Sequence, residues 1–201
     1  MKIICLGRNY TQSHNAQGEN TQEPIVFLKP DSAILKDNKP FFIPDFAKSF
    51  EYEGELVFHI NRLGKNISER FAHRYYDAVT VGLDIASTDL LSSQIQDSLP
   101  WDLAKGFDGS ALLGEFIPVD NLDVTSLRFS VRSGNDVLQR GNSTDQVWSI
   151  DKIVAYVSQF YTLKIGDLIY AGAPQVARTL QVGQKLQGFL EDKQVFDIDI
   201  R

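Results

Sequence analysis

Apolar and polar residues alternate most regularly in the segment FEYEGELVFHI, which spans residues 50 to 60. Alternate side chains of a β-strand share a face, so this pattern predicts a strand with one apolar face and one mixed face. The apolar face would carry the side chains of Phe50, Tyr52, Leu56, Phe58 and Ile60. The mixed face would carry a row of three carboxylates, followed by two further residues: Glu51, Glu53, Glu55, Val57 and His59.

Shorter apolar runs, separated by prolines, glycines and other turn residues, predict further strands along the chain. They are expected within residues 1–10, 24–30, 39–46 and 79–88. The segment LRFSVRSGNDVLQRGN, residues 127–142, predicts a hairpin because SGND supplies the residues of a tight turn. The tail of the chain, from residue 164 to residue 200, alternates in the same way around a turn near Glu191 and Asp192.

Helical spacing of apolar residues is present in three segments. Residues 66–79 and 89–99 predict short helices, and SIDKIVAYVSQFYTL, residues 149–163, has the clearest helical pattern. Ser149 would cap this helix, and Asp151 would suit its positive end. Its apolar stripe would consist of Ile153, Val154, Val157, Phe160 and Tyr161. Many short strands with a few helices predict the α+β class, with a mostly antiparallel or rolled sheet.

Residues 11–24, TQSHNAQGENTQEP, are polar and lack apolar periodicity. We expect a mobile loop or a weak helix there, of the kind that closes over a ligand as a lid. The segment contains His14, one of three histidines in the chain, whose spacing does not resemble a zinc site.

Composition narrows the classes of partner. The chain has 201 residues, 43% of them hydrophobic, which suits one globular domain over residues 1–201. Lys plus Arg total 20 and Asp plus Glu total 26, so the net charge is −6 and no nucleic-acid partner is expected. No apolar stretch approaches the roughly 20 residues that span a bilayer, so no membrane partner is expected either. The single cysteine, Cys5, excludes a disulfide framework, and the lack of a signal-peptide pattern favours a cytoplasmic location.

The row of glutamates has two interpretations. One is a solvent-facing strand, because one face of an antiparallel sheet is often wet. The other is a divalent cation site, because carboxylate oxygens suit hard cations and Mg²⁺ typically takes one or two protein carboxylates. Asp84, a lone charge inside the apolar run VTVGLDIAST, is the best candidate for a third ligand, since a buried carboxylate is costly unless it is paired or metal-bound.

Lys105 lies in WDLAKGFDGSALLGEF, between two small residues and close to Trp101 and Phe107. A lysine in that setting either points into a pocket, where it would bind an anionic substrate or an enolate, or lies on a surface turn. The chain contains no serine or cysteine nucleophile motif and no phosphate-binding glycine loop.

Several segments, in order along nearly the whole chain, together resemble the fumarylacetoacetate hydrolase family. They are CLGRNY, PIVFLKPDSAI, YEGEL, VGLDIASTD, WDLAKGFDGSALLG, GNSTD before SIDKIVAYVSQFYTLKIGDLI, and the AGAP turn. The resemblance is closest to the short members of the family that act on acylpyruvates or oxaloacetate. It implies a mixed β-roll like that of the family's C-terminal domain, with a few short helices, and a homodimer.

The resemblance also implies roles for individual residues. It makes Glu53, Glu55 and Asp84 the ligands of Mg²⁺ or Mn²⁺, and leaves Glu51 outside the ligand set. A small 2-oxo or diketo acid would be the substrate. Its anionic groups would be bound around the metal by a set of basic and aromatic residues, and proton transfer would involve residues of the lid. The substrate-binding set is Arg8, Tyr10 and Lys29, and the catalytic set is Lys105, His14 and Glu19.

The sequence departs from the family pattern around the substrate. Close relatives resemble DxTARDxQ after the metal-binding aspartate, whereas Thr88 and Leu91 stand at the arginine and glutamine positions here. The family's GTPxGVG turn appears as GAPQVAR, with Ala173 in place of the threonine. Relatives place a histidine three residues before a glutamate in the lid, whereas the nearest acid after His14 is Glu19.

These observations support three hypotheses. The first is a metal-dependent enzyme that hydrolyses acylpyruvate-type carbon–carbon bonds, or decarboxylates or tautomerises acids of the oxaloacetate type. The second is an isomerase of 2-hydroxyhepta-2,4-diene-1,7-dioate-type acids. The third is a catalytically weakened paralogue that keeps the metal and binds a ligand. We favour an enzyme, because a desolvated cluster of three carboxylates is electrostatically unfavourable without a cation.

Overall fold

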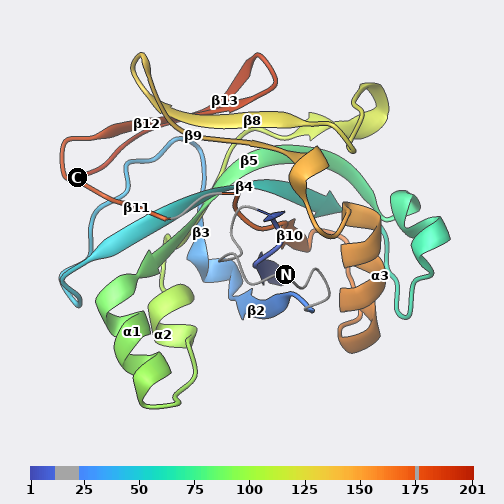
Figure 1. The fold of residues 1–201 in the computed structure, drawn as a ribbon, viewed down its shortest axis with the longest axis horizontal. Helices are drawn as coiled ribbons and strands as arrows, with labels where there is room; N and C mark the ends of the chain where they lie inside the picture. The colour runs from blue at the N-terminus through green and yellow to red at the C-terminus, as the bar shows by residue number, and fades with distance from the viewer. Residues whose placement is uncertain (12–22, 175–176) are drawn as a thin grey trace.

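The computed structural model of the chain describes residues 1–11, 23–174 and 177–201, and Figure 1 shows their arrangement. The strands form two sheets, and the mixed α+β architecture with a rolled sheet that the sequence predicts is confirmed. The larger sheet has nine strands: β1 (Ile3–Gly7), β2 (Ile25–Lys29), β3 (Ile34–Leu35), β4 (Phe50–Ile60), β5 (Tyr76–Ser87), β6 (Ala111–Leu113), β7 (Ile117–Pro118), β10 (Leu168–Tyr170) and β11 (Arg178–Thr179). The smaller sheet has four: β8 (Arg128–Ser133), β9 (Asp136–Asn142), β12 (Lys185–Leu190) and β13 (Lys193–Asp199).

The long antiparallel pair of β4 and β5 runs through the middle of the larger sheet. The strand order is β2-β1-β10-β4-β5-β6-β3, with β11 paired to β4 and β7 paired to β5. Strand β1 pairs in parallel with β10, and β3 pairs in parallel with β6, while the other pairings in this sheet are antiparallel. The predicted alternation in β4 is confirmed, because all five residues of its apolar face are buried in the main core.

The larger sheet curls so that strands distant in its order face each other. The ammonium of Lys29, on edge strand β2, donates hydrogen bonds to the carbonyl oxygens of Ile85 at 3.0 Å and Ser110 at 2.7 Å. The hydroxyl of Tyr170, on β10, donates to the carbonyl oxygen of Leu112, on β6, at 2.8 Å. These contacts cross the inside of the curl, so the face that carries the glutamates is enclosed rather than spread open to solvent.

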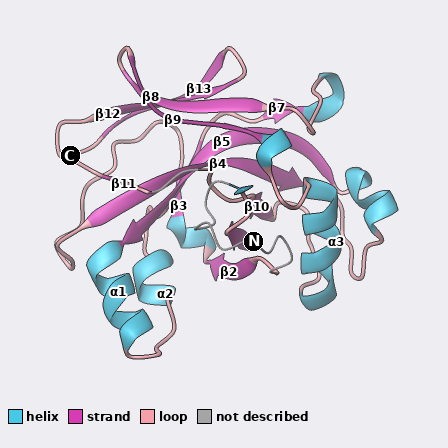
Figure 2. Cartoon of the chain, in the orientation of Figure 1, coloured by secondary structure: helices cyan, strands magenta, loops and turns pink. Residues whose placement is uncertain are grey.

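The smaller sheet covers the other face of β4 and β5 (Figure 2). Its buried residues, among them Phe129, Val131 and Phe196, join the apolar face of β4 in one core. Two tight hairpins build this sheet, as predicted. Gly134 adopts a φ of 57° in the turn between β8 and β9, and Glu191 a φ of 50° in the turn between β12 and β13. The two faces of β4 therefore meet different surroundings, one apolar and one charged.

Helices lie at the ends of the curled sheet (Figures 1 and 2). Helix α3 (Ile150–Phe160) begins as predicted, because the side chain of Ser149 accepts a hydrogen bond from the amide of Lys152. Helices α1 (Thr88–Gln96) and α2 (Asp102–Lys105) pack together beside β5. Short 3₁₀ helices complete the elements: η2 (Asp31–Ala33), η3 (Glu69–Arg74), η4 (Val119–Asn121) and η5 (Ser143–Asp145).

Three predictions of local structure need correction. Residues 39–46 form no strand, because Pro40 and Pro44 interrupt the ladder and only Phe41 makes an isolated bridge, to Ile200. The helix expected over residues 66–79 is the 3₁₀ helix η3, and β5 already begins at Tyr76. Phe160 does not belong to the buried stripe of α3, since its side chain at the last helical position is 58% exposed. In the described part of the chain, no helix is long and apolar enough to cross a membrane.

Candidate metal centre

Three acidic side chains converge on the enclosed face of the larger sheet. Glu53 and Asp84 are register partners across the antiparallel pair of β4 and β5, and Glu55 follows two positions later on the same face of β4. One carboxylate oxygen from each of the three residues lies within 4.8 Å of the others. Glu55 and Asp84 are buried, and the side chain of Glu53 is 32% exposed. Glu51 lies outside this cluster, which is the separation that the sequence analysis expects.

Two lysines balance part of this negative charge. The ammonium of Lys29 reaches Asp84 Oδ1 at 2.6 Å from β2, with no side-chain exposure. The ammonium of Lys105, at the last position of α2, donates to Asp84 Oδ2 at 2.9 Å and lies 3.9 Å from Glu53 Oε2. Each carboxylate oxygen of Asp84 thus contacts the ammonium group of one lysine. Lys105 points into the site rather than lying on a surface turn, and its ammonium stands 5.2 Å from the ring centroid of Phe27.

The backbone near Gly172 holds the third carboxylate. The amide of Gly172 donates to Glu55 Oε2 at 2.6 Å, and this residue has a φ of +88°. A Cβ there would lie 2.9 Å from Cβ of Asn9, so glycine is required for both the conformation and the space. The carboxamide of Asn9 fixes the turn from the other side, because it donates to the carbonyl oxygens of Ala171 at 2.8 Å and Trp148 at 3.1 Å.

Burial and like charge set the protonation of the cluster. Burial raises the pKa of the Glu53 carboxyl to about 7, with Lys105 opposing the shift and Asp84 adding to it. Burial also raises the pKa of Glu55 well above its ordinary value, and the charges of Asp84 and Glu53 add to that effect. Burial alone would raise the pKa of Asp84 too, but Lys105 and Lys29 hold it below its ordinary value.

The residues present fit a hard divalent cation. Three carboxylates face two ammonium groups, so the cluster carries one negative charge in excess when all five groups are ionised. Burial, with the like charges adding to it, makes ionisation of the two glutamates costly, and their raised pKa values express that cost. A divalent cation would remove this cost, and an oxygen donor set is the kind that Mg²⁺ and Mn²⁺ take.

Two further residues predicted for the site, Arg8 and Tyr10, lie within the described part of the chain. Arg8 is exposed just after β1, with a φ of 61°. Tyr10 is fully buried, and its hydroxyl accepts a hydrogen bond from Gln146 Nε2 at 3.2 Å. His14 and Glu19 fall outside the described residues. His59 pairs with Asp77 at 2.7 Å and does not join the carboxylate cluster.

The three positions that depart from the family pattern lie within the described residues. The Thr88 hydroxyl is 2.7 Å from the Ser49 hydroxyl at the start of α1, Leu91 is half-buried, and Ala173 is buried. Asn9 and Gly172 support Glu55 from behind, and neither is among the site residues expected from the sequence. Both stand within segments that carry the resemblance, GRNY and AGAP, and that placement was the available signal.

An apolar hollow of about 350 Å³ lies next to Lys105. It is lined by Phe27, Leu28, Pro100, Trp101, Asp102 and Lys105. Phe27 and Trp101 meet edge to face, with their ring centroids 6.5 Å apart. The hollow therefore places an apolar wall beside the ammonium group that contacts Asp84.

Comparisons with known proteins find relatives of this chain in both sequence and fold. An oxaloacetate decarboxylase from Dictyostelium discoideum is 33% identical over 207 residues, which cover 100% of this chain and 94% of that protein. An oxaloacetate tautomerase from Escherichia coli is 30% identical over 188 residues, which cover 92% of this chain and 86% of the relative. Among solved structures, a fumarylpyruvate hydrolase from Pseudomonas aeruginosa in complex with Mn²⁺ and pyruvate has a TM-score of 0.91 at 26% identity, covering 100% of this chain and 89% of that one.

The family comparison extends over almost the entire sequence. The model of the family described as fumarylacetoacetate (FAA) hydrolase C-terminal matches residues 2–201. That range includes the three converging carboxylates, both lysines and the Gly172 turn. The fold, the site and the sequence match lead to the same result, and the chain belongs to the fumarylacetoacetate hydrolase family.

Proposed function

We propose that this protein is a divalent-metal-dependent enzyme that acts on small 2-oxo or diketo acids. The reactions considered are decarboxylation or tautomerisation of the oxaloacetate type and carbon–carbon hydrolysis of the acylpyruvate type. The observation that carries the proposal is the convergence of Glu53, Glu55 and Asp84 within 4.8 Å of one another, with the ammonium of Lys105 at their edge. Such a site combines a cation position with a group that binds anions.

Glu53, Glu55 and Asp84 would hold Mg²⁺ or Mn²⁺. A cation bound there would supply Lewis-acid stabilisation of negative charge on a substrate oxygen. The chain contributes the orientation of the ligands, because Gly172 holds Glu55 and the two lysines hold Asp84. It also limits water around the ligands, since two of the three carboxylates are buried.

Lys105 would bind and stabilise the anionic substrate rather than act as a base. Burial by itself would lower the pKa of its ammonium, but the charges of Asp84 and Glu53 raise it above its ordinary value. The side chain therefore stays protonated at neutral pH and can donate a hydrogen bond to a carboxylate or an enolate oxygen. The apolar hollow beside it would receive the part of the substrate that is remote from the reacting atoms.

The choice among the reactions depends on a base. Hydrolysis needs a group that activates water, and the candidates for it, His14 and Glu19, come from the sequence analysis. Decarboxylation and tautomerisation need less help of this kind, because stabilising the enolate is the main requirement. Arg8, Tyr10 and Lys29 complete the proposed substrate site, with Lys29 acting through Asp84. We also propose a homodimer on the basis of the family resemblance, which light scattering at micromolar concentration would test. A cytoplasmic location is proposed separately, from the lack of a signal-peptide pattern.

A substrate screen tests the proposed function. Protein stripped of metal with EDTA would be supplied with Mg²⁺ or Mn²⁺ and assayed with oxaloacetate, acylpyruvates and hydroxymuconate-type acids. We expect turnover that requires the metal and is abolished in Glu55→Gln. Glu51→Gln is the matched control, because Glu51 lies on the same face of the same strand but outside the cluster.

Two outcomes would change the conclusion. Turnover of only the hydroxymuconate-type acids would favour the isomerase alternative. Metal binding without turnover of any of these acids would favour the ligand-binding paralogue, for which the side chains at Thr88, Leu91 and Ala173 are the supporting observation.

A further inference from the structure

The edge of β4 that faces β10 and β11 is interrupted at the candidate metal centre. Strand β11 pairs with Glu51 and Tyr52, and β10 pairs with residues 57–59. Between these two pairings, no strand of the described residues lies against positions 53–56 on that side. Along the same edge, the carbonyl oxygen of Phe50 accepts from Leu180 and that of Leu56 accepts from Ala171. The backbone amide of Gly54 points into the interval between them.

A side chain from the smaller sheet fills this interval. Oε1 of Gln139, on β9, accepts a hydrogen bond from the amide of Gly54 at 2.6 Å. Gln139 is 1% exposed, so the contact is shielded from water. A Cβ at position 54 would lie 2.6 Å from Cγ2 of Val131 and 2.8 Å from this same Oε1 atom. Glycine inside the strand is therefore required by the close approach of the smaller sheet.

Gly54 stands between two of the proposed metal ligands, Glu53 and Glu55. The orientation of its two flanking peptide units sets the direction of both side chains. Glu55 has a second support in the amide of Gly172, and Asp84 is held by two lysines. Within the described part of the chain, the carboxylate of Glu53 makes no hydrogen bond and has only Lys105, at 3.9 Å, as an ion-pair partner. Its position therefore depends on the backbone of β4, which β5 holds along one edge and Gln139 holds at Gly54 on the other edge.

We propose that Gln139 is a positioning residue for the metal centre, which acts through the amide of Gly54 to hold Glu53 and Glu55 in the geometry that binds one divalent cation. The inference rests on the proposed function, because it concerns the same metal site. Groups that orient metal ligands from behind typically change metal affinity by about 10- to 100-fold when they are lost. Gln139 would be such a group, supplied by the sheet that carries no ligand itself.

The test uses Gln139→Met in the full chain, because methionine keeps the length and apolar volume of the side chain but removes the carboxamide acceptor. Mn²⁺ would be titrated into metal-free protein, and electron paramagnetic resonance would report both free Mn²⁺ and the spectrum of the bound ion. Ser158→Ala is the matched control, because Ser158 Oγ is also a buried acceptor of a backbone amide, that of Ile67 at 2.8 Å, in a contact between α3 and the residues before η3.

We expect Gln139→Met to weaken Mn²⁺ binding by about 10-fold or more and to change the spectrum of the bound ion. Ser158→Ala should lower the melting temperature about as much as Gln139→Met does. It should leave the Mn²⁺ affinity and the spectrum of the bound ion unchanged. Equal Mn²⁺ affinity in wild type and Gln139→Met would overturn the positioning role while leaving the proposed function in place. An equal loss of affinity in both variants would make Gln139 a general stability residue and would also overturn it. Failure of wild type to bind Mn²⁺ would overturn the metal centre itself.

Discussion

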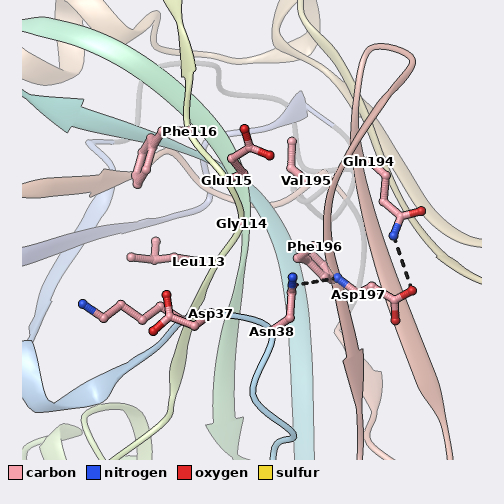
Figure 3. A pocket seen from close by; sticks show the side chains of 11 residues that line it. Asp37, Asn38, Leu113, Gly114, Glu115, Phe116, Gln194, Val195, Phe196 and Asp197 are labelled. Carbon is pink, nitrogen blue, oxygen red and sulfur yellow. Dashed lines mark hydrogen bonds between the residues drawn. The ribbon is translucent and has the colours of Figure 1, made fainter.

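Two groups of acidic residues in this molecule differ in a way that bears on function. Glu53, Glu55 and Asp84 converge on an enclosed face of the larger sheet. A larger hollow, of about 510 Å³, lies elsewhere and is lined by residues 36–38, 113–116 and 194–197 (Figure 3). It also contains acids, and two of them, Glu115 and Asp197, pair with exposed lysines. Glu115 pairs with Lys193 at 2.9 Å, and Asp197 pairs with Lys185 at 2.9 Å.

The difference shows that volume is a poor guide to chemistry in this fold. In the hollow of Figure 3, the carboxylate of Asp197 accepts hydrogen bonds from Gln194 and from Gln187, so its charge is satisfied locally. The backbone amide of Asp197 donates to Oδ1 of Asn38. In the carboxylate cluster, burial and mutual repulsion leave two glutamates with raised pKa values. Buried carboxylates that the fold brings together, and that nearby lysines only partly balance, are the feature that indicates a ligand.

The largest effect is expected from Asp84→Asn. This change leaves the fully buried ammonium of Lys29 without its anionic partner and removes one proposed metal ligand. We expect the free energy of unfolding of the metal-free protein to fall by about 3–5 kcal/mol, as urea denaturation would measure, and Mn²⁺ binding to be lost. An Asp84→Asn protein with the stability of the wild type would show that the cluster is no more strongly coupled than the acids of the exposed hollow.

A large but smaller effect is expected from Lys105→Met. Methionine keeps much of the stem that packs beside Phe27 but removes the ammonium that would bind the substrate anion. We expect kcat/KM for the best substrate of the screen to fall by about 10²- to 10³-fold, while Mn²⁺ still binds. Lys193→Met, which removes the exposed partner of Glu115, is the control. Unchanged kcat/KM in Lys105→Met would remove this residue from the site.

A smaller effect, on the pH dependence of stability, should also distinguish the carboxylate cluster from the acids of the hollow in Figure 3. The folded chain keeps a proton on Glu53 up to a pKa of about 7, whereas the ordinary value is 4.5. The folded state therefore binds more protons than the unfolded state between these values, and the stability that this group contributes is lost as the pH rises through that window. Unfolding of metal-free wild type and Glu53→Gln across the window should show a downward slope that is weaker in the variant. Equal slopes would contradict the raised pKa.

The smallest effect is expected from Glu115→Gln. Its carboxylate is 67% exposed and pairs with a half-exposed lysine, and such pairs contribute little because water screens them. We expect no measurable change in the free energy of unfolding, in Mn²⁺ affinity or in turnover. A loss of turnover in this variant would show that the hollow of Figure 3 takes part in function and would end the contrast between the two regions.

The local features of the molecule were predictable from the sequence because they depend on neighbours in the chain. Alternation in FEYEGELVFHI predicted both faces of β4, and the lone charge of Asp84 in an apolar run predicted its unusual surroundings. The serine cap of α3 and the turn at Glu191 are local in the same sense. The grouping of Glu53, Glu55 and Asp84 as ligands came from the family resemblance, and their convergence within 4.8 Å agrees with it.

The supports of the site were not predictable in this way, because they join distant parts of the chain. Nothing near Gln139 in sequence indicates that its carboxamide reaches Gly54, 85 positions away. The amide of Gly172 reaches Glu55 across 117 positions. Alternation shows which face of a strand is polar, but it does not show which distant element covers that face. In residues 39–46, apolar composition suggested a strand that the prolines at positions 40 and 44 prevent.

The parallel pairing of β1 with β10 has a consequence for the order in which the parts of the protein fold. Strand β10 lies between β1 and β4 in the sheet, so a nascent chain cannot seat its first strands until residue 170 has been synthesised. Long-range parallel pairings of this kind form slowly. In refolding with pulsed hydrogen exchange, we expect amides of β4 and β5 to gain protection before those of β1. Lys29, carried on the β1–β2 pair, would then reach Asp84 among the last contacts, so the site becomes competent only after residue 170 has been made.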